Sequence, residues 1–271
     1  FDDLFQDPRL AYHAVVQWLS RKHVNEVLAR GGELGVDLYL DLPLGVHPDG
    51  FDAWRWAEDF VSGVSGGSPP DGFFTEGQNW GFPPLHPERA RERGHRYLRH
   101  VLSHLTRYCR LVRIDHAMSL QRLFWVPIGM SAKEGLYVHY SSEELFAVLC
   151  LESARNGCAL VGEDLGTVTP EIRQQMDHRG VHRMYVGQFE FSADRTPPFY
   201  DPPQRVVASL NTHDTPTAAG FWYGDDIDDR VELGILERER AAAEHESRSL
   251  VRQAFMRYLG CLLYTSPSPR D

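Results

Sequence analysis

The stretch Leu111-Val112-Arg113-Ile114-Asp115-His116 decides the fold class, because its apolar residues run directly into a charged trio. Two later segments have the same form, namely Ala159-Leu160-Val161-Gly162-Glu163-Asp164 and Ala208-Ser209-Leu210-Asn211-Thr212-His213-Asp214. Each is typical of a buried parallel strand that ends in a carboxylate. Because C-terminal strand ends converge on one site in a barrel of parallel strands, Asp115, Glu163 and Asp214 are expected to meet there.

Strand-like and helix-like segments alternate along the chain, which predicts an α/β fold with a parallel sheet. Strands are expected at 36–42, 111–115, 159–163, 184–189 and 206–212. Helices are expected at 11–30, where Gly31-Gly32 would end the first of them, and at 87–109, 141–157, from 169 onward and 232–259. Five strands are fewer than the eight of a closed barrel. The chain is therefore expected to be a piece of a barrel that lacks its start and its end.

Local signals give some of the helix boundaries. Ser141 and Glu144 have the spacing of a capping box, and Gly157 is placed to end the same helix. Thr169 followed by Pro170 is a typical helix start.

Two regions do not fit the alternation. Residues 47–87 are rich in Gly, Pro and aromatic residues with little periodicity, which predicts an inserted functional loop or lid. The last residues, 261–271, have neither periodicity nor charge balance and are expected to be a non-native tail, with a flexible native terminus as the alternative. The expected organisation is a partial catalytic barrel over 1–260, with the insertion at 47–87, followed by that tail.

Composition limits the function classes. Hydrophobic residues make up 42% of the chain, enough for a sizeable core. The net charge of −10 argues against nucleic acid as a partner and favours a neutral substrate. No apolar run approaches the ~20 residues of a membrane span, and the N-terminal residues do not form a signal peptide. The four cysteines form no C-x-x-C pair, so reduced thiols in a cytoplasmic protein are expected.

The residue types at the strand ends fit glycosidic-bond cleavage with retention, which needs a nucleophilic carboxylate and a protonated carboxyl ~5–5.5 Å apart. Asp115 suits the nucleophile, because Arg113 lies two residues earlier on the same strand face and favours the ionised form. Glu163 suits the acid/base, because the small and apolar residues before it raise a carboxyl pKa. Asp214, next to His213, can accept hydrogen bonds from sugar hydroxyls.

Each of these patterns taken alone has a structural alternative. Arg113 and Asp115 could form a structural ion pair, Glu163 could be a solvated strand end or a helix cap, and His213 with Asp214 could be a buried hydrogen-bonded pair. A metal site fails on ligand count, because no H-x-x-x-H or comparable pair accompanies His213, so no metal is expected. The run 69–84 mixes aromatic rings with amides in the manner of a wet carbohydrate site, although ordinary aromatic packing would explain it too.

The chain resembles the 4-α-glucanotransferases, also called amylomaltases or disproportionating enzymes, of glycoside hydrolase family 77. The resemblance runs from about residue 12 to about residue 258 and is specific, because several motifs occur in the family's order. These are Leu40-Asp41-Leu42-Pro43-Leu44-Gly45-Val46, Gly77-Gln78-Asn79-Trp80-Gly81, Arg113-Ile114-Asp115-His116, Gly162-Glu163-Asp164-Leu165-Gly166 and Asn211-Thr212-His213-Asp214.

The resemblance implies a (β/α)₈ TIM barrel, incomplete here, with strands three to seven present and the first two and the eighth missing. It implies Asp115 as nucleophile, Glu163 as acid/base and Asp214 as transition-state stabiliser, with no cofactor. It also implies substrate contacts, which are Asp41, Gln78, Trp80, Arg113, His116 and His213. Gln78 and Trp80 fall in the loop that the family places on the acceptor side. The chain departs from common family patterns at Phe82, at Ala117-Met118-Ser119-Leu120 and at Thr215-Pro216-Thr217.

The expected activity is transfer of α-1,4-glucan segments to the 4-hydroxyl of an acceptor by retaining double displacement. The expected partners are a maltodextrin or other α-1,4-glucan donor and a glucose or maltooligosaccharide acceptor, with neither nucleic acid nor membrane. The alternatives are an α-amylase-type glucan hydrolase and a truncated, inactive glucan-binding fragment.

Overall fold

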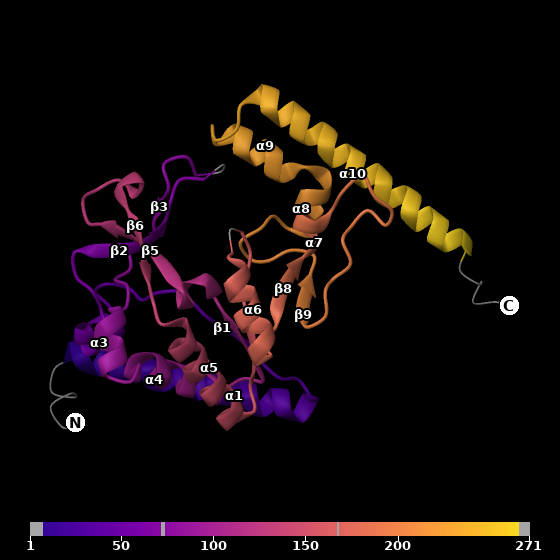
Figure 1. The fold of residues 1–271 in the computed structure, drawn as a ribbon. Helices are drawn as coiled ribbons and strands as arrows, with labels where there is room; N and C mark the ends of the chain where they lie inside the picture. The colour runs from indigo at the N-terminus through magenta and orange to yellow at the C-terminus, as the bar shows by residue number, and fades with distance from the viewer. Residues whose placement is uncertain (1–7, 72–73, 167, 266–271) are drawn as a thin grey trace. The chain divides into compact units, whose positions relative to one another are not determined.

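The computed structural model describes residues 8–71, 74–166 and 168–265 of a mixed α/β chain (Figure 1). It divides into two compact units, Phe1–His182 and Arg183–Asp271. The first unit contains a three-stranded sheet and a four-stranded sheet, and the second contains a two-stranded sheet. The mixture of helices and strands confirms the predicted α/β class. Among the described residues, none of the three sheets closes on itself.

The three-stranded sheet of the first unit is parallel, with the order β1-β4-β7. Its strands are β1 (Tyr39–Leu42), β4 (Leu111–Ile114) and β7 (Ala159–Gly162). They are short and apolar, and β4 and β7 end where the sequence turns to charged residues, as predicted. The predicted strand 36–42 begins later, at Tyr39.

Helices pack on this sheet to form the main core. They are α4 (Arg96–Leu105), α5 (Ser142–Asn156) and α6 (Pro170–Arg179). The core joins Leu102 of α4, Phe146 and Leu149 of α5 and Ile172 and Met176 of α6 to Val112 of β4. All six are 1% exposed or less, so this cluster holds β4 firmly under the site.

The single helix predicted over 87–109 is wrong, because the structure has α3 (Pro87–Glu92) and α4 there instead. Gly94 and His95 between them both have a positive φ, at 61° and 52°, which an α-helix cannot contain. His95 is held by a hydrogen bond of 2.9 Å between its Nε2 and Glu144 Oε2. The apolar residues at helical spacing, Leu98, Leu102 and Leu105, all lie in α4, so this pattern did not reveal the break.

Helix α5 starts where predicted but without the predicted capping box. Ser141 makes no side-chain capping hydrogen bond, and Glu144 binds His95 and Arg91 instead. The C-terminal prediction is confirmed, because Gly157 ends α5 in the left-handed conformation, with a φ of 61°. Thr169 precedes Pro170 at the start of α6 as predicted, although its hydroxyl donates to Gln121 Oε1 at 2.8 Å rather than capping the helix.

Residues 47–87, expected to be a largely irregular insertion, contain regular structure. The segment includes α2 (Phe51–Arg55), η2 (Ala57–Asp59), β2 (Val64–Ser68) and β3 (Gln78–Asn79). Strands β2 and β3 belong to an antiparallel sheet of order β3-β2-β5-β6. Four further elements were not predicted from the sequence, which are β5 (Arg122–Pro127), β6 (Leu136–His139) and the short η3 (Ala117–Leu120) and η4 (Ala132–Glu134).

Helix α1 (Pro8–Leu34) confirms the first predicted helix but extends it at both ends. Gly31-Gly32 does not end it; the helix continues to Leu34, and Gly35 follows with a φ of 68°. An apolar stripe at helical spacing runs along this helix and is largely exposed, with Tyr12 at 65% and Val27 at 52%. Helical periodicity therefore gave the conformation of this segment correctly but not its burial.

The second unit pairs β8 (Arg183–Val186) with β9 (Val206–Ser209) in parallel. Both strands are shorter than the predicted 184–189 and 206–212, and the short helix α7 (Gly187–Glu190) directly follows β8. Helices α8 (Ala218–Tyr223), α9 (Asp225–Glu232) and α10 (Arg238–Thr265) complete the unit.

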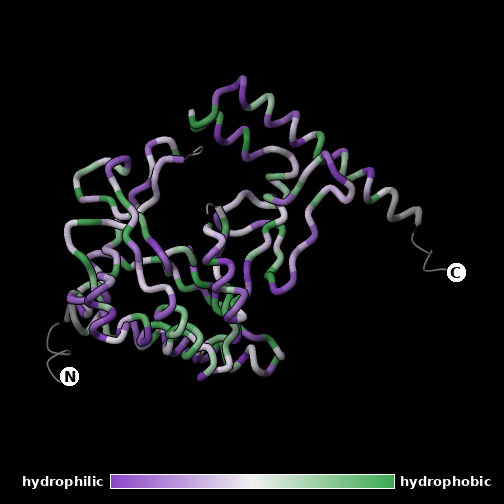
Figure 2. Tube along the Cα trace, in the orientation of Figure 1, coloured by the Kyte–Doolittle hydropathy of each residue, from purple (hydrophilic) through white to green (hydrophobic). Residues whose placement is uncertain are grey.

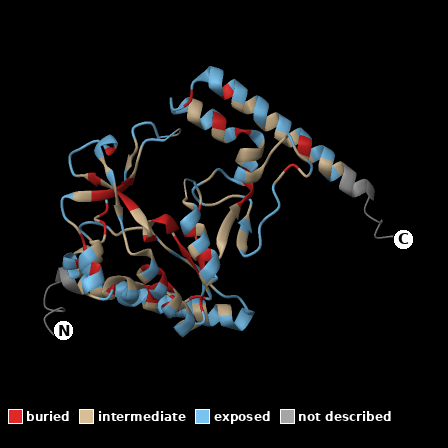
Figure 3. Cartoon of the chain, in the orientation of Figure 1, coloured by how far each residue is buried: buried red, intermediate tan, exposed pale blue. Residues whose placement is uncertain are grey.

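The predicted helix 232–259 is split, because α9 ends at Glu232 and α10 begins only at Arg238. Gly234 between them has a φ of 70°, which breaks the helix. Hydrophilic and hydrophobic residues alternate along α10 rather than forming blocks (Figure 2), and most of the helix is exposed (Figure 3). The backbone of α10 runs through Thr265, into the predicted tail, whose residues 266–271 lie outside the described part of the chain.

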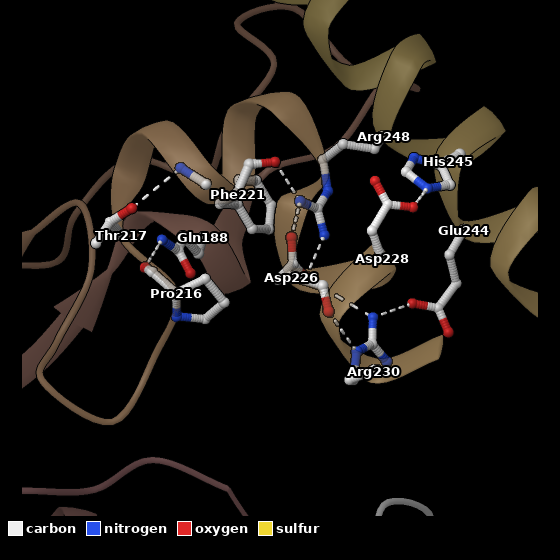
Figure 4. A network of polar contacts seen from close by, with 11 residues as sticks. Gln188, Pro216, Thr217, Phe221, Asp226, Asp228, Arg230, Glu244, His245 and Arg248 are labelled. Atoms are coloured by element: carbon white, nitrogen blue, oxygen red, sulfur yellow. Dashed lines mark hydrogen bonds and ion pairs between the residues drawn. The ribbon is translucent and has the colours of Figure 1, made fainter. Parts of the chain in front are cut away.

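A polar network joins α8, α9 and α10 (Figure 4). The Arg248 guanidinium lies 3.4 Å from the centre of the Phe221 ring, and it donates to Asp226 Oδ1 at 2.9 Å. His245 Nε2 lies 2.9 Å from Asp228 Oδ1. These contacts tie the long α10 to the two shorter helices.

Two features are absent from the described residues. None of the helices in that part of the chain is long and apolar enough to cross a membrane. Within the same residues there is no group of three or more His, Cys, Asp or Glu side chains placed to hold a metal ion.

Candidate active site

Arg113 lies at the centre of the candidate site in the first unit. The parallel register places it beside Asp41 of β1, and its side chain is 8% exposed. One guanidinium nitrogen donates to both Asp41 oxygens, each at 2.9 Å, and the other lies 2.7 Å from Asp115 Oδ1. The predicted pairing of Arg113 with Asp115 is therefore present, and Asp41 is a second partner for the same guanidinium.

The surroundings keep Arg113 charged. Burial by itself would lower its pKa, but the hydrogen bonds to Asp41 and the negative charges of Asp115, Asp41 and Glu163 outweigh burial and raise the pKa. A permanently charged, planar donor can hold two carboxylates in a fixed geometry.

Asp115 is held from a second side by backbone. The Leu44 N–H donates to Asp115 Oδ2 at 3.3 Å, and the Asp115 N–H donates to the Leu42 carbonyl at 3.0 Å. Arg113 and Leu44 thus bind different oxygens of the Asp115 carboxylate. Its side chain remains 31% exposed, so it is fixed but still accessible.

Glu163 follows the neighbouring strand β7 and is held by two backbone N–H groups. Leu165 donates to its Oε1 at 2.6 Å and His116 donates to its Oε2 at 3.0 Å. Burial raises the pKa of Glu163, the charge of Asp115 raises it further, and Arg113 and the two N–H donors oppose these effects without cancelling them. This direction agrees with the sequence argument for a carboxyl that holds a proton.

His116 connects the two carboxylates. It follows Asp115 directly, and its left-handed backbone, with φ at 46° and ψ at 61°, lets its N–H reach Glu163. Burial lowers the pKa of its imidazole, against the opposing charge of Asp115. The imidazole packs edge-on against Trp80, with ring centres 5.4 Å apart. Gln78 accepts a hydrogen bond of 2.8 Å from the Trp80 indole N–H.

The structure thus brings seven of the predicted site residues into one connected group in the first unit. They are Asp41, Gln78, Trp80, Arg113, Asp115 and His116, and Glu163 joins the group through its bond to His116.

Asp214 and His213 belong to the second unit. Both are exposed, and His213 Nε2 lies 3.2 Å from Asp214 Oδ2. They follow β9 in a turn in which the Asp214 N–H donates to Thr212 Oγ1 at 3.2 Å. The end of this loop is anchored by the buried Gln188, whose amide donates to the Pro216 carbonyl at 2.7 Å (Figure 4). The convergence of Asp214 with Asp115 and Glu163 stays a prediction.

Sequence reasoning missed several residues that build the site. The N–H groups of Leu44 and Leu165 have no side-chain signal, so only the fold reveals them. Asp164, next to Glu163, is 2% exposed and pairs with Arg173 of α6 at 3.2 Å, which anchors the loop after β7. A carboxylate followed nine residues later by an arginine on a predicted helix was the available signal for that pair.

An arginine-bound aspartate and a half-buried glutamate at the ends of neighbouring parallel strands define an α/β protein with a carboxylate site of the glycosidase type. The sequence profile of glycoside hydrolase family 77, described as 4-alpha-glucanotransferase, matches residues 5–266. The chain belongs to this family.

Individual relatives agree with the family match. A 4-alpha-glucanotransferase from Haemophilus influenzae is 33% identical over 253 residues, which is 93% of this chain and 36% of the relative. A 4-alpha-glucanotransferase from Mycobacterium bovis is 36% identical over 254 residues, which is 90% of this chain and 35% of the relative. The crystal structure of amylomaltase from Corynebacterium glutamicum superposes with a TM-score of 0.80 at 32% identity, covering 88% of this chain and 34% of that chain. The chain therefore spans about a third of the length of these relatives.

Proposed function

We propose that the complete protein carrying this chain is a 4-α-glucanotransferase that moves α-1,4-glucan segments to the 4-hydroxyl of an acceptor. The observation that carries this proposal is the pairing of unlike carboxyls on neighbouring strands. Asp115 is bound by Arg113 and Leu44, whereas burial raises the pKa of Glu163. Two carboxyls with different environments can divide the roles of nucleophile and acid between them.

In the first half of the reaction, Glu163 donates its proton to the leaving glucan oxygen while Asp115 attacks the anomeric carbon. The bond between the anomeric carbon and that oxygen breaks, and a glycosyl ester of Asp115 forms. In the second half, Glu163 takes the proton of the acceptor 4-hydroxyl, whose oxygen displaces Asp115. Configuration is retained because the anomeric carbon is inverted twice.

The remaining predicted residues act on the substrate in this proposal. Asp214 accepts hydrogen bonds from the hydroxyls of the reacting sugar, with His213 beside it. Asp41, Gln78, Trp80, Arg113 and His116 line the binding site, with Gln78 and Trp80 on the acceptor side. The donor is a maltodextrin and the acceptor is glucose or a maltooligosaccharide. No cofactor takes part in these steps, and the expected compartment is the cytoplasm.

Transfer exceeds hydrolysis, in this proposal, because the 69–84 segment screens the glycosyl ester from water and stacks the acceptor. Shortening that segment in the complete protein should raise the release of glucose by hydrolysis. An unchanged ratio of transfer to hydrolysis would refute this role.

We also propose that β1, β4, β7, β8 and β9 are the third to seventh strands of an incomplete (β/α)₈ barrel. The catalytic part would cover 1–260, with an insertion at 47–87, and residues 261–271 would be a non-native tail. Support comes from the chain's coverage of about a third of its relatives, from the open sheets and from the exposed apolar stripe of α1.

Maltotriose is the substrate that tests the activity of the complete protein. A ladder of longer maltodextrins is the expected product, whereas simple breakdown would indicate an α-amylase-type hydrolase. Asp115→Asn should abolish turnover, and Asp37→Asn is a matched control, because Asp37 is a carboxylate of the same unit that is 73% exposed. Turnover that survives in Asp115→Asn contradicts the nucleophile assignment, and a wild-type protein without turnover would support an inactive glucan-binding fragment.

A further inference from the structure

Phe82 occupies a slot between two glycines next to the candidate site. Its side chain is 8% exposed. A Cβ atom added at Gly66 of β2, or at Gly45 after β1, would lie closer than 3.0 Å to atoms of the Phe82 ring, far inside contact distance. All three nearest atoms at each glycine belong to this one ring. The two glycines therefore make room for Phe82, and the ring packs directly against the backbone at each of them.

Phe82 also contacts the ring of Trp80. The Trp80 and Phe82 rings are nearly parallel, with an interplanar angle of 17° and centres 6.2 Å apart. Backbone hydrogen bonds of 2.9 Å join the Gly66 N–H to the Phe82 carbonyl and the Trp80 N–H to the Gly66 carbonyl. Trp80 in turn packs edge-on against His116, whose N–H binds Glu163.

On the Gly45 side, the slot leads to Asp115. Gly45 directly follows Leu44, whose N–H donates to Asp115 Oδ2 at 3.3 Å. Phe82 thus touches two segments that come from different sheets of the first unit. Trp80, which stacks on Phe82, contacts the residue that binds Glu163, and the Leu44–Gly45 segment binds Asp115.

We propose that Phe82 is a positioning residue that sets Trp80 against His116 and holds the Leu44–Gly45 turn against Asp115. A stiff aromatic ring fills the slot in one orientation, whereas a shorter or more flexible side chain leaves both segments free to shift. A misplacement of about 1 Å can lower a rate by as much as ~10²-fold. This inference rests on the proposed function, because Trp80 is taken to line the acceptor side.

Three variants of the complete protein test this role. Phe82→Leu and Phe82→Met keep an apolar side chain in the slot but lose the rigid ring. Gly66→Ala displaces the ring without changing Phe82, and Gly66 does not need a positive φ, so alanine suits its backbone. With maltotriose as donor and glucose as acceptor, kcat/KM for the acceptor should fall about tenfold. The share of turnovers that end in hydrolysis should rise.

Matched controls separate positioning from a loss of stability. Phe60→Leu shortens a phenylalanine that is 7% exposed and packs on Tyr97, with ring centres 5.0 Å apart. Gly135→Ala pushes a methyl group into the ring of Phe124, and against the Trp125 carbonyl, in the same antiparallel sheet as β2, so it is at least as disruptive as Gly66→Ala. Both controls should lower the urea midpoint like the test variants while leaving acceptor kcat/KM and the hydrolysis share unchanged.

The outcomes are distinct. If Phe82→Leu and Phe82→Met fold and match Phe60→Leu in acceptor kinetics, the positioning role is overturned, whatever Gly66→Ala does. If only the Phe82 and Gly66 variants lose acceptor kcat/KM, it is supported. Simple breakdown of maltotriose by the wild type would instead remove the proposed transferase function, and turnover that persists in Asp115→Asn would remove its nucleophile assignment, each independently of Phe82.

Discussion

Removing the Arg113 guanidinium gives a direct test of how the site is held together. Arg113→Met keeps most of the apolar length but leaves Asp41 and Asp115 without their shared donor. Breaking a fully buried ion pair in this way costs about 3–5 kcal/mol. Here the Asp41 side chain is 41% exposed and that of Asp115 is 31% exposed, so water solvates both carboxylates in the variant. We therefore expect a loss of about 2 kcal/mol, near the lower end of what hydrogen bonds to charged groups contribute.

The assay is urea unfolding of the complete protein, with the loss appearing as a lower midpoint at an unchanged slope. Arg113→Lys keeps the charge but cannot span both carboxylates, so it should lose about half as much as Arg113→Met. In a double-mutant cycle, Asp41→Asn should cost less in the Arg113→Met background than in the wild type. The shared role of Arg113 would be refuted if Arg113→Met unfolded at the same urea concentration as the wild type. It would also be refuted if the losses of unfolding free energy caused by Arg113→Met and Asp41→Asn were strictly additive.

Two further predictions concern the pH dependence and the second unit. Burial raises the pKa of Glu163, so the folded state binds the proton of this carboxyl more tightly than the unfolded state does. The free energy of unfolding of the wild type should therefore fall as pH rises from the ordinary carboxyl range through the folded pKa. Glu163→Gln should remove that fall, which urea midpoints over a pH series will measure. If the variant and the wild type show the same pH dependence, the raised pKa of Glu163 is contradicted. Arg248→Met should cost about 3 kcal/mol, because Arg248 and Asp226 are each only 14% exposed. Arg230→Met, at a site that is 29% exposed, should cost less in thermal unfolding followed by circular dichroism, and equal losses would contradict the burial argument.

The parallel strands could be predicted because their sequence signal is local. In β4 and β7 a short apolar run ends at a charged residue, and the strands end there. Strand β2 has no such signal, since its Val-Ser-Gly-Gly-Ser sequence has little intrinsic preference for a strand. Its glycines are required by neighbours, including Phe82, that are distant in sequence. The break between α3 and α4 was missed for a related reason, because the Glu144 that binds His95 lies 49 residues further along the chain.

The contacts of the candidate site likewise fall into those that the sequence predicts and those that it does not. The contact between Arg113 and Asp115 could be predicted, because residues two apart on a strand share a face. The hydrogen bonds from one Arg113 nitrogen to both Asp41 oxygens depend on the register between β1 and β4, which residue spacing does not give. The N–H donors of Leu44 and Leu165 depend on loop conformation and have no counterpart in side-chain chemistry. The sequence therefore predicts candidate reactive groups, but it does not predict the register and backbone contacts that hold them.

The register of the parallel sheet explains why one arginine can order this site. Asp41 and Arg113 are direct partners across β1 and β4, and Asp115 is the next residue on the same face of the chain beyond β4. The guanidinium therefore lies between the two carboxylates without any loop having to place it. A shift of β1 by one residue would turn Asp41 to the opposite face of the sheet and leave Arg113 with Asp115 alone. The position of Asp115 consequently depends on the buried core beneath β4 as well as on the Leu44 N–H, which makes substitutions in that core a route to altered activity without any change at the site.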